Sequence, residues 1–588
     1  MKSKNKIERL HTISGYTITE KIFEQTPYVI YRGLREGDGL EVVIKTFSDT
    51  YPKKEDILGL KREYRITKSL SFKGIIEHYD IIEHSHTNMA IVMESFGISL
   101  QDYLQKLNAN RCSLDDFFWI AIKLVETCGY LQKRRIIHKK LNPFNILIDP
   151  NSKEIRIIDL SDSSELSQET IQHVPFSHWD NNTIMYISPE QTGRINRGID
   201  YRSDFYSLGM CFYQMLTGVL PFKADDAIGW VHATISRTPI PLNELNPNIP
   251  PVISELVLKL LSKNAEHRYQ SGHGLLYDLK TCRELIKTGD PHFQLHLGKE
   301  DLSQEFQIPQ KLYGREREME LLETLFENVS LGSVEFCLVS GYSGIGKTAL
   351  VSELGRYIVK KNGYLIQGKF EQFKQNAPFS TIADAFGDLL EQLFGEPVER
   401  FKVWQENLRS ALGEDAQLLT DLIHRLETII GPQETIPILS PDEFQKRFYK
   451  VFISFVKVFT KKDHPLVLFM DDLQWSDVPT LNLIRELVTS SDLEHFFIIG
   501  AYRNKEVDAT HPLSLVLREI QSKRFLEDIE LKPLEPHAFY ALLRESLFCS
   551  PNEAEALGLE LYNKTGGNPF FFIQLLKNLK ESNAISFD

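Results

Sequence analysis

The sequence has few cysteines, and none of them lie close together. Its six cysteines (Cys112, Cys128, Cys211, Cys282, Cys337 and Cys549) are scattered, with no CxxC pair. This spacing argues against a disulfide framework or a zinc site and favours reduced thiols. The polar start, MKSKNKIERL, is not followed by an apolar signal core. Because no window approaches about 18 apolar residues, we expect no membrane span and a cytoplasmic location.

An excess of charge of one sign is also missing. The formal net charge is −13, from 67 Lys and Arg against 80 Asp and Glu. So mild a charge argues against a general nucleic-acid coat, though not against a local basic patch, and we expect no specific nucleic-acid partner. The chain has neither internal repeats nor low-complexity tracts. Its 588 residues exceed what one hydrophobic core usually serves, since domains average roughly 100–200 residues.

Two patterns divide the chain. Short alternating runs over 16–50 predict an antiparallel sheet, and mainly helical periodicity follows from about residue 100. We therefore expect an N-terminal extension at 1–14 and an α+β bilobal domain at 15–285. The stretch 286–311 has weak periodicity and is predicted to be a linker. Over 312–588, short β-rich runs alternate with amphipathic segments, which predicts an α/β domain with a parallel sheet and flanking helices.

The segment GYSGIGKT, at 341–348, fits the phosphate-binding pattern GxxxxGK[ST] completely. It follows the apolar run VEFCLVS and opens a helical segment, so its backbone N–H groups are expected to face phosphates at a helix N-terminus. Lys347 is placed to reach the β- and γ-phosphates of ATP, and the Thr348 hydroxyl to ligate Mg²⁺. The predicted ATP-binding residues of this loop are Gly341, Ser343, Gly344, Ile345, Gly346, Lys347 and Thr348.

An apolar run that ends in two acids, PLVLFMDDLQW, supports this prediction. Asp471 is expected to hold Mg²⁺, and Asp472 to polarise the attacking water. Arg503 follows the next apolar run, HFFIIGAY. It is expected at the same carboxyl edge of the sheet, where its guanidinium could contact the γ-phosphate; the alternative is a solvated surface arginine.

These segments, together with YGREREMELL and TGGNPFFF, resemble STAND-type signalling ATPases of the AAA superfamily. The resemblance covers about 312–588. It implies a switch that is off with ADP and on with ATP, and that tends to self-associate in the ATP-bound state.

The first half carries seven features in a fixed order. They are Lys45 in VVIK, Glu63 in LKREYRITKSL, IIHKKLNPFNILI with Lys140 and Asn145, Asp159 in IRIIDLS, Glu190 in YISPEQTG, Asp204 in DYRSDFYSLG and Arg268 in NAEHRYQS. Their order and spacing resemble the eukaryotic-type Ser/Thr protein kinase fold. The resemblance implies that Lys45 and Glu63 form an ion pair and bind ATP, that Asn145 and Asp159 ligate Mg²⁺, and that the last three residues hold the fold.

The departures from that pattern concern the chemistry of transfer. No glycine precedes Gly33 in IFEQTPYVIYRG, where a Gly-rich loop is expected, and Pro27 removes a donor. Lys140 stands in the place of the catalytic aspartate and Asn142 in the place of a lysine. An ammonium cannot accept a hydroxyl proton at neutral pH, so this degenerate base position predicts impaired phosphotransfer. Lys140 could instead clamp a phosphate.

The whole arrangement resembles the N-terminal half of bacterial hybrid signalling kinases. It implies a cytosolic signalling protein with a kinase-like, impaired module coupled to a P-loop ATPase, using ATP and Mg²⁺. The partners implied are ATP or ADP, and signalling proteins or downstream kinase modules. Two alternatives remain: an active Ser/Thr kinase regulated by the ATPase domain, and a non-enzymatic nucleotide-binding scaffold.

Overall fold

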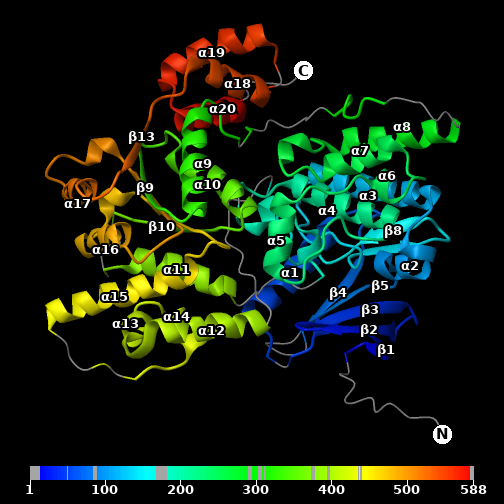
Figure 1. The fold of residues 1–588 in the computed structure, drawn as a ribbon. Coiled ribbons are helices and arrows are strands. Elements are labelled where there is room, and N and C mark those ends of the chain that lie inside the picture. The colour runs from blue at the N-terminus through cyan, green and yellow to red at the C-terminus, as the bar shows by residue number, and fades with distance from the viewer. Residues whose placement is uncertain are drawn as a thin grey trace.

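The computed structural model describes residues 13–584 except 50, 84–88, 167–181, 195–196, 289–294, 302–307, 310, 373–377, 394–397, 435, 437–439, 548 and 583. The predicted extension at 1–14 therefore lies almost wholly outside the described residues. Figure 1 shows an N-terminal half made of a small sheet and a helical lobe, beside a C-terminal half built on a second sheet. Within the described residues, none of the helices combines the length and apolarity needed to cross a bilayer.

An antiparallel five-stranded sheet forms the predicted small lobe, in the order β1-β2-β3-β5-β4. Its strands are β1 (Tyr16–Gln25), β2 (Tyr28–Arg35), β3 (Glu41–Phe47), β4 (His78–Glu83) and β5 (Met89–Glu94). Helix α1 (Lys54–Ser69) buries Leu60 and Glu63. Successive residues of β3 alternate between faces, so that Ile44 joins one apolar cluster while Phe47 packs with Leu60 in another.

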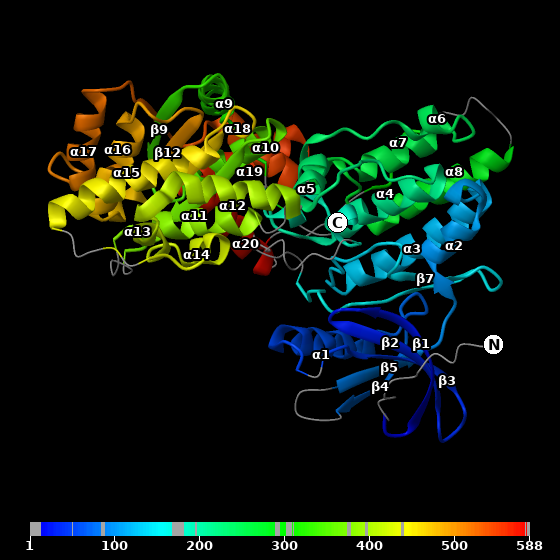
Figure 2. The same ribbon diagram turned by 60° about the horizontal axis from the view of Figure 1, so that its bottom comes forward.

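The large lobe is helical around one core. Its elements are β6 (Ile98–Ser99), α2 (Leu100–Lys106), α3 (Leu114–Lys133), β7 (Ile146–Asp149), β8 (Glu154–Ile157), α4 (Tyr201–Thr217), α5 (Ala227–Ser236), α6 (Leu242–Leu245), α7 (Pro251–Leu260) and α8 (Gly272–Thr288). The Ser113 hydroxyl caps α3 by accepting from the Asp116 N–H, and α4 ends at Gly218, whose φ of 79° suits glycine. Figure 2 shows this lobe lying over the small-lobe sheet.

All five strands of the second sheet are parallel, in the order β10-β11-β12-β9-β13. They are β9 (Val334–Gly341), β10 (Tyr364–Lys369), β11 (Leu466–Asp471), β12 (Phe496–Tyr502) and β13 (Glu527–Leu531). Strand β11 is buried along its whole length, as expected for a central strand covered on both faces. Along β9, Leu338 contacts the cluster on one face and Val339 the cluster on the other.

Helices cover both faces of this sheet, which confirms the predicted α/β architecture (Figure 1). They are α9 (Glu316–Ser330), α10 (Lys347–Lys360), α11 (Ser380–Leu393), α12 (Val398–Leu412), α13 (Gln417–Thr420), α14 (His424–Ile430), α15 (Pro441–Phe459), α16 (Val478–Thr489) and α17 (Pro512–Gln521). Three further helices pack around their own core: α18 (Pro536–Leu547), α19 (Pro551–Thr565) and α20 (Pro569–Glu581).

Candidate functional site

The loop from Gly341 to Gly346 joins the end of β9 to the start of α10, as the sequence predicted. Gly341, Gly344 and Gly346 have φ values of 150°, 76° and 103°, which only glycine adopts without strain. The loop therefore bends back over the N-terminus of α10. A helix N-terminus with free N–H groups favours phosphate.

Lys347 is the first residue of α10 and is buried. Its ammonium donates to the carbonyl oxygens of Gly341, at 3.0 Å, and Tyr342, at 3.1 Å. Burial lowers the pKa of Lys347, and the nearby Asp471 and Asp472 oppose that shift. The ammonium is thus held by neutral carbonyls inside its own loop, a position from which it can turn to an anion.

Thr348 and Asp471 meet at the edge of the sheet, 123 residues apart in sequence. The Thr348 hydroxyl donates to the Asp471 carboxylate at 2.8 Å. A hydroxyl beside a carboxylate is an oxygen donor pair suited to Mg²⁺, which keeps water and phosphate oxygens as its other ligands. Among the described residues, no group of three or more His, Cys, Asp or Glu side chains is placed to hold a metal ion.

Asp472 follows in a left-handed conformation, with φ 55°. Its carboxylate accepts from Gln474 Nε2 at 2.9 Å and lies 3.3 Å from Arg503 Nε. Gln474 also accepts from the Arg503 backbone N–H at 3.1 Å, so it ties the two predicted residues together. Sequence reasoning assigned no role to Gln474, although it lies within the motif that follows Asp472.

Arg503 is held on three sides rather than solvated. It pairs with Glu506 at 2.9 Å, and its guanidinium lies 4.7 Å from the ring centre of Trp475. With Asp472 on the third side, its head group stays at the carboxyl edge of the sheet. The role of Arg503 toward a γ-phosphate remains a prediction.

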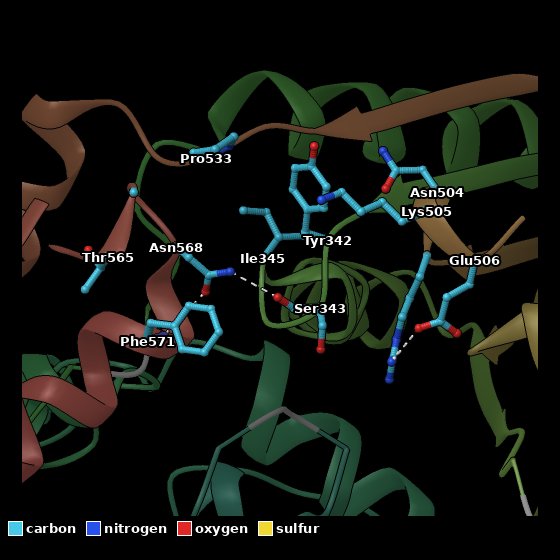
Figure 3. A pocket seen from close by; sticks show the side chains of 12 residues that line it. Tyr342, Ser343, Ile345, Asn504, Lys505, Glu506, Pro533, Thr565, Asn568 and Phe571 are labelled. Carbon is cyan, nitrogen blue, oxygen red and sulfur yellow. Dashed lines mark hydrogen bonds and ion pairs between the residues drawn. The ribbon is translucent and has the colours of Figure 1, made fainter. Parts of the chain in front are cut away.

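A cavity of about 470 Å³ opens beside the phosphate loop. Figure 3 shows Tyr342, Ser343 and Ile345 on one wall, and Asn568 and Phe571 from the C-terminal helices on the other. The Asn568 amide donates to the Ser343 carbonyl at 3.0 Å, and the N–H of Phe570 donates to the Gly344 carbonyl at 3.3 Å. The segment TGGNPFFF thus closes against the phosphate loop, which no local sequence pattern indicated.

In the N-terminal half, β3 and α1 bring together the predicted pair Lys45 and Glu63. The Lys45 ammonium lies 2.8 Å from Glu63 and 2.9 Å from Asp159. Burial alone would lower the pKa of Lys45, but these two carboxylates outweigh it and raise the pKa. The cation is paired with one buried carboxylate, that of Glu63, and one half-buried carboxylate, that of Asp159.

Lys140 occupies the centre of this cleft. Its ammonium lies 2.8 Å from Asp162, 4.0 Å from Asp159 and 3.5 Å from the Ser161 hydroxyl. Burial alone would lower the pKa of Lys140, but the Asp159 and Asp162 carboxylates outweigh burial and raise the pKa. The side chain therefore stays a cation. The nearby Asn145 amide donates to the Lys140 carbonyl at 2.9 Å.

The framework predicted for the large lobe is assembled. Arg268 grips Glu190 through two hydrogen bonds, of 2.6 and 2.8 Å, with both side chains buried. The Asp204 carboxylate accepts from the backbone N–H groups of His138 and Lys139, both at 2.8 Å. These contacts fix the loop that carries Lys140.

Comparison with known proteins gives two family matches. Residues 20–276 match the protein kinase domain, and residues 311–499 match the AAA ATPase domain. The chain is 27% identical over 509 residues to hybrid signal transduction histidine kinase G of Dictyostelium discoideum, covering 72% of this chain and 15% of that protein. It is 24% identical over 409 residues to histidine protein kinase 1 of Candida albicans, covering 62% and 16%.

A bacterial relative matches the first half only. Serine/threonine-protein kinase PrkC of Bacillus subtilis is 26% identical over 268 residues, 44% of this chain and 39% of that protein. The chain spans about one sixth of the length of these two histidine kinases. The chain therefore combines a protein kinase domain with a following AAA-type P-loop ATPase domain.

Proposed function

We propose that the chain is a cytoplasmic ATP-binding signalling protein, in which the P-loop ATPase is the nucleotide-operated element. Its kinase-like module is impaired in phosphotransfer and is coupled to the ATPase. The observation that carries the proposal is the state of two side chains. Asp472 offers a carboxylate beside the phosphate loop, whereas the base position of the kinase-like cleft holds the Lys140 ammonium.

The residues of the ATPase site have distinct tasks. Lys347 exchanges its two carbonyl partners for phosphate oxygens, which carry the charge those carbonyls lack. Mg²⁺, when bound between Thr348 and Asp471, supplies charge neutralisation of the phosphates. Asp472, oriented by Gln474, accepts the proton of the attacking water. Arg503 lies 3.3 Å from Asp472, and its guanidinium can stabilise the negative charge that develops on the γ-phosphate.

A direct contact between the two domains supports the coupling. Figures 1 and 2 both show α5 of the kinase-like lobe beside α10, the helix that begins at Lys347. Val231 and Ile235 of α5 form a buried apolar cluster with Val359 of α10. Packed side chains thus connect the P-loop helix α10 with the kinase-like lobe, and coupling between sites can be transmitted through such packing.

The same contact continues toward the kinase-like cleft. A Cβ on Gly355 would lie 3.1 Å from the Arg194 carbonyl, so the absence of a side chain there permits close approach. Arg194 follows the short 3-10 helix Pro189–Thr192, from which the Gln191 amide donates to the Lys139 carbonyl at 2.8 Å. Nucleotide-dependent movement of α10 thus has a packed route to the loop of Lys140.

The test measures phosphate release and autophosphorylation side by side on the full chain. We expect phosphate release that falls about 100-fold or more in Lys347→Ala and is unchanged in the matched variant Lys45→Ala, with no phosphate on serine or threonine. Transfer that is lost in Asp159→Ala and kept in Lys347→Ala would instead establish an active Ser/Thr kinase. Binding without release or transfer would establish the scaffold.

Downstream kinase modules and other signalling proteins are the partners that this proposal implies, with ATP-dependent self-association of the ATPase domain. The Dictyostelium and Candida relatives are both named as histidine kinases, which supports a signalling context for the proposal. Sedimentation of the chain with ATP and with ADP tests the self-association. A larger species that appears only with ATP is expected.

A further inference from the structure

A tyrosine occupies the kinase-like cleft at the point where phosphates would meet the lysine of β3. Tyr28 is the first residue of β2 and lies opposite Phe47 in the β2–β3 ladder, while Ile30 lies opposite Lys45. Residues two apart in a strand share a face, so Tyr28 is on the cleft side together with Lys45. The Lys45 ammonium lies 4.5 Å from the centre of the Tyr28 ring.

The ring of Tyr28 fits its surroundings closely. It stacks on Phe47 with ring centres 5.6 Å apart, and its hydroxyl donates to the Asp56 carbonyl of α1 at 3.4 Å. A Cβ on Gly59 would lie in ordinary contact with the Tyr28 hydroxyl, at 3.6 Å, and with the Ser161 side chain, at 3.7 Å, so both groups lie close to the backbone of α1. Tyr28 therefore bridges the sheet, α1 and the segment after β8.

The expected metal position is taken as well. Asp159 Oδ1 accepts from Lys45, at 2.9 Å, and from the Ser161 hydroxyl, at 2.8 Å, while Oδ2 lies 4.0 Å from the Lys140 ammonium. A divalent cation at Asp159 would stand beside that ammonium and be repelled. The residues of this cleft do not fit the Mg²⁺ that a kinase fold implies.

From these contacts we infer that Tyr28 and Lys140 replace, within the chain, the phosphates and the metal of a bound nucleotide, so that the N-terminal cleft stays closed without ligand. The chain then binds one nucleotide, at the P-loop. The inference deepens the proposed function and rests on its impaired kinase-like module. It departs from the sequence-based expectation that Lys45, Asn145 and Asp159 bind ATP and Mg²⁺.

The electrostatic reason is that this cluster is complete. Two ammonium groups, of Lys45 and Lys140, face three carboxylates, of Glu63, Asp159 and Asp162. A triphosphate would add negative charge to this set and would have to displace the Tyr28 ring from Lys45. Lys45 and Glu63 are buried, and separating a buried ion pair is strongly unfavourable. Binding of a nucleotide in this cleft is therefore unfavourable in free energy.

The first experiment counts nucleotides by equilibrium dialysis with radiolabelled ATP and Mg²⁺, using the full chain. We expect one ATP per chain, and none in Lys347→Ala at concentrations up to about 1 mM. Retention of a site in Lys347→Ala that is lost on adding Lys45→Ala overturns the inference. Such a result would leave the proposed phosphate release at the P-loop untouched, so the two failures are distinguishable.

The second experiment opens the cleft in the Lys347→Ala background. Tyr28→Gly combined with Lys140→Asp is expected to gain Mg²⁺-dependent ATP uptake, whereas Tyr28→Phe, which keeps the ring, gains none. Circular dichroism establishes that each variant is folded. A folded Tyr28→Gly/Lys140→Asp chain that takes up no ATP, or uptake by Tyr28→Phe, overturns the assignment of the exclusion to these two side chains.

Discussion

The two lysines placed to meet phosphate have opposite surroundings. Lys347 donates to two neutral carbonyls of its own loop, and burial lowers its pKa. Lys45 is buried as well, but Asp159 and Glu63 outweigh burial and raise its pKa. A phosphate would give Lys347 an anionic partner in place of neutral carbonyls, whereas Lys45 already has two anionic partners. Whether a lysine in a nucleotide motif binds nucleotide therefore depends on which anions already surround it.

The comparison extends to the acids. In the ATPase site Asp472 meets an amide and a guanidinium at its edge, so one carboxylate remains beside the phosphate loop. In the kinase-like cleft Asp159 and Asp162 are both engaged by Lys140. Under the proposed function Asp472 is the acid kept for chemistry, while it also pairs with Arg503 and Lys369, whereas Asp159 and Asp162 pair with Lys140.

The largest effect on stability is expected from breaking the buried ion pair between Arg268 and Glu190 in the kinase-like domain. Arg268→Ala leaves the buried Glu190 carboxylate unpaired and should lower the free energy of unfolding by about 3–5 kcal/mol. The double variant Glu190→Gln/Arg268→Met, which removes both charges, should lose less. Urea unfolding measures both. Equal losses would show that the ion pair itself, rather than an uncompensated charge, carries the stability.

The same pair has a defined pH dependence. Burial alone would raise the pKa of Glu190, but Arg268 outweighs it and lowers the pKa to about 2. A depressed carboxylate pKa stabilises the fold above the unfolded value of 4.5, and this contribution is lost as the pH falls toward about 2. The stability difference between wild type and Glu190→Gln/Arg268→Met should therefore shrink over that interval. A constant difference would contradict the assignment.

The second prediction concerns the acid kept for chemistry. Asp472→Asn should lower ATP hydrolysis by about 10²–10⁴-fold, because the amide cannot accept a proton from water. ATP binding should change little, since Lys347 and Thr348 remain. Asp162→Asn is the matched control in the kinase-like cleft and should leave phosphate release unchanged. Comparable losses from the two variants would remove the distinction between the sites.

The third prediction converts Lys140 to the missing aspartate. Lys140→Asp removes the partner of Asp159 and Asp162 and adds a third carboxylate, so it should lower the free energy of unfolding by about 1–3 kcal/mol. Lys140→Met, which adds no carboxylate, should lose less. Autophosphorylation should not appear in either variant, because Tyr28 still fills the cleft. Its appearance in Lys140→Asp would mean that only the base was missing.

The sequence predicted what depends on local pattern. GYSGIGKT after an apolar run placed the phosphate loop between β9 and α10, and the acids after PLVLFM placed Asp471 beside Thr348. The two domains and their fold classes were also predicted and are confirmed by the family matches. In the first half, the order of the motifs predicted that Lys45 pairs with Glu63, and the two side chains lie 2.8 Å apart.

What the sequence could not show depends on distant pairing. The position of Tyr28 over Lys45 follows from the register of β2 against β3, which no motif states. Asn568 reaches Ser343 across 225 residues, through the packing of the C-terminal helices. Lys140 pairs with Asp162 at 2.8 Å, a contact that no motif in the sequence states.

The smallest effect is expected at the charged rim of the contact between the domains. Arg400 lies 3.3 Å from Asp226, and because 69% of the Arg400 side chain is exposed, water and salt screen its charge. Arg400→Ala should therefore change the free energy of unfolding by less than about 1 kcal/mol, an effect that salt reduces further. Truncating Asp226 instead would mix two effects, because its side chain also caps α5 by accepting from the Gly229 N–H. Urea unfolding of Arg400→Ala beside Val359→Ala, which removes apolar packing from the same contact, separates the two contributions. The loss of unfolding free energy in Arg400→Ala could also equal or exceed the loss in Val359→Ala. That result would show that charge, rather than apolar packing, stabilises the contact between the two domains.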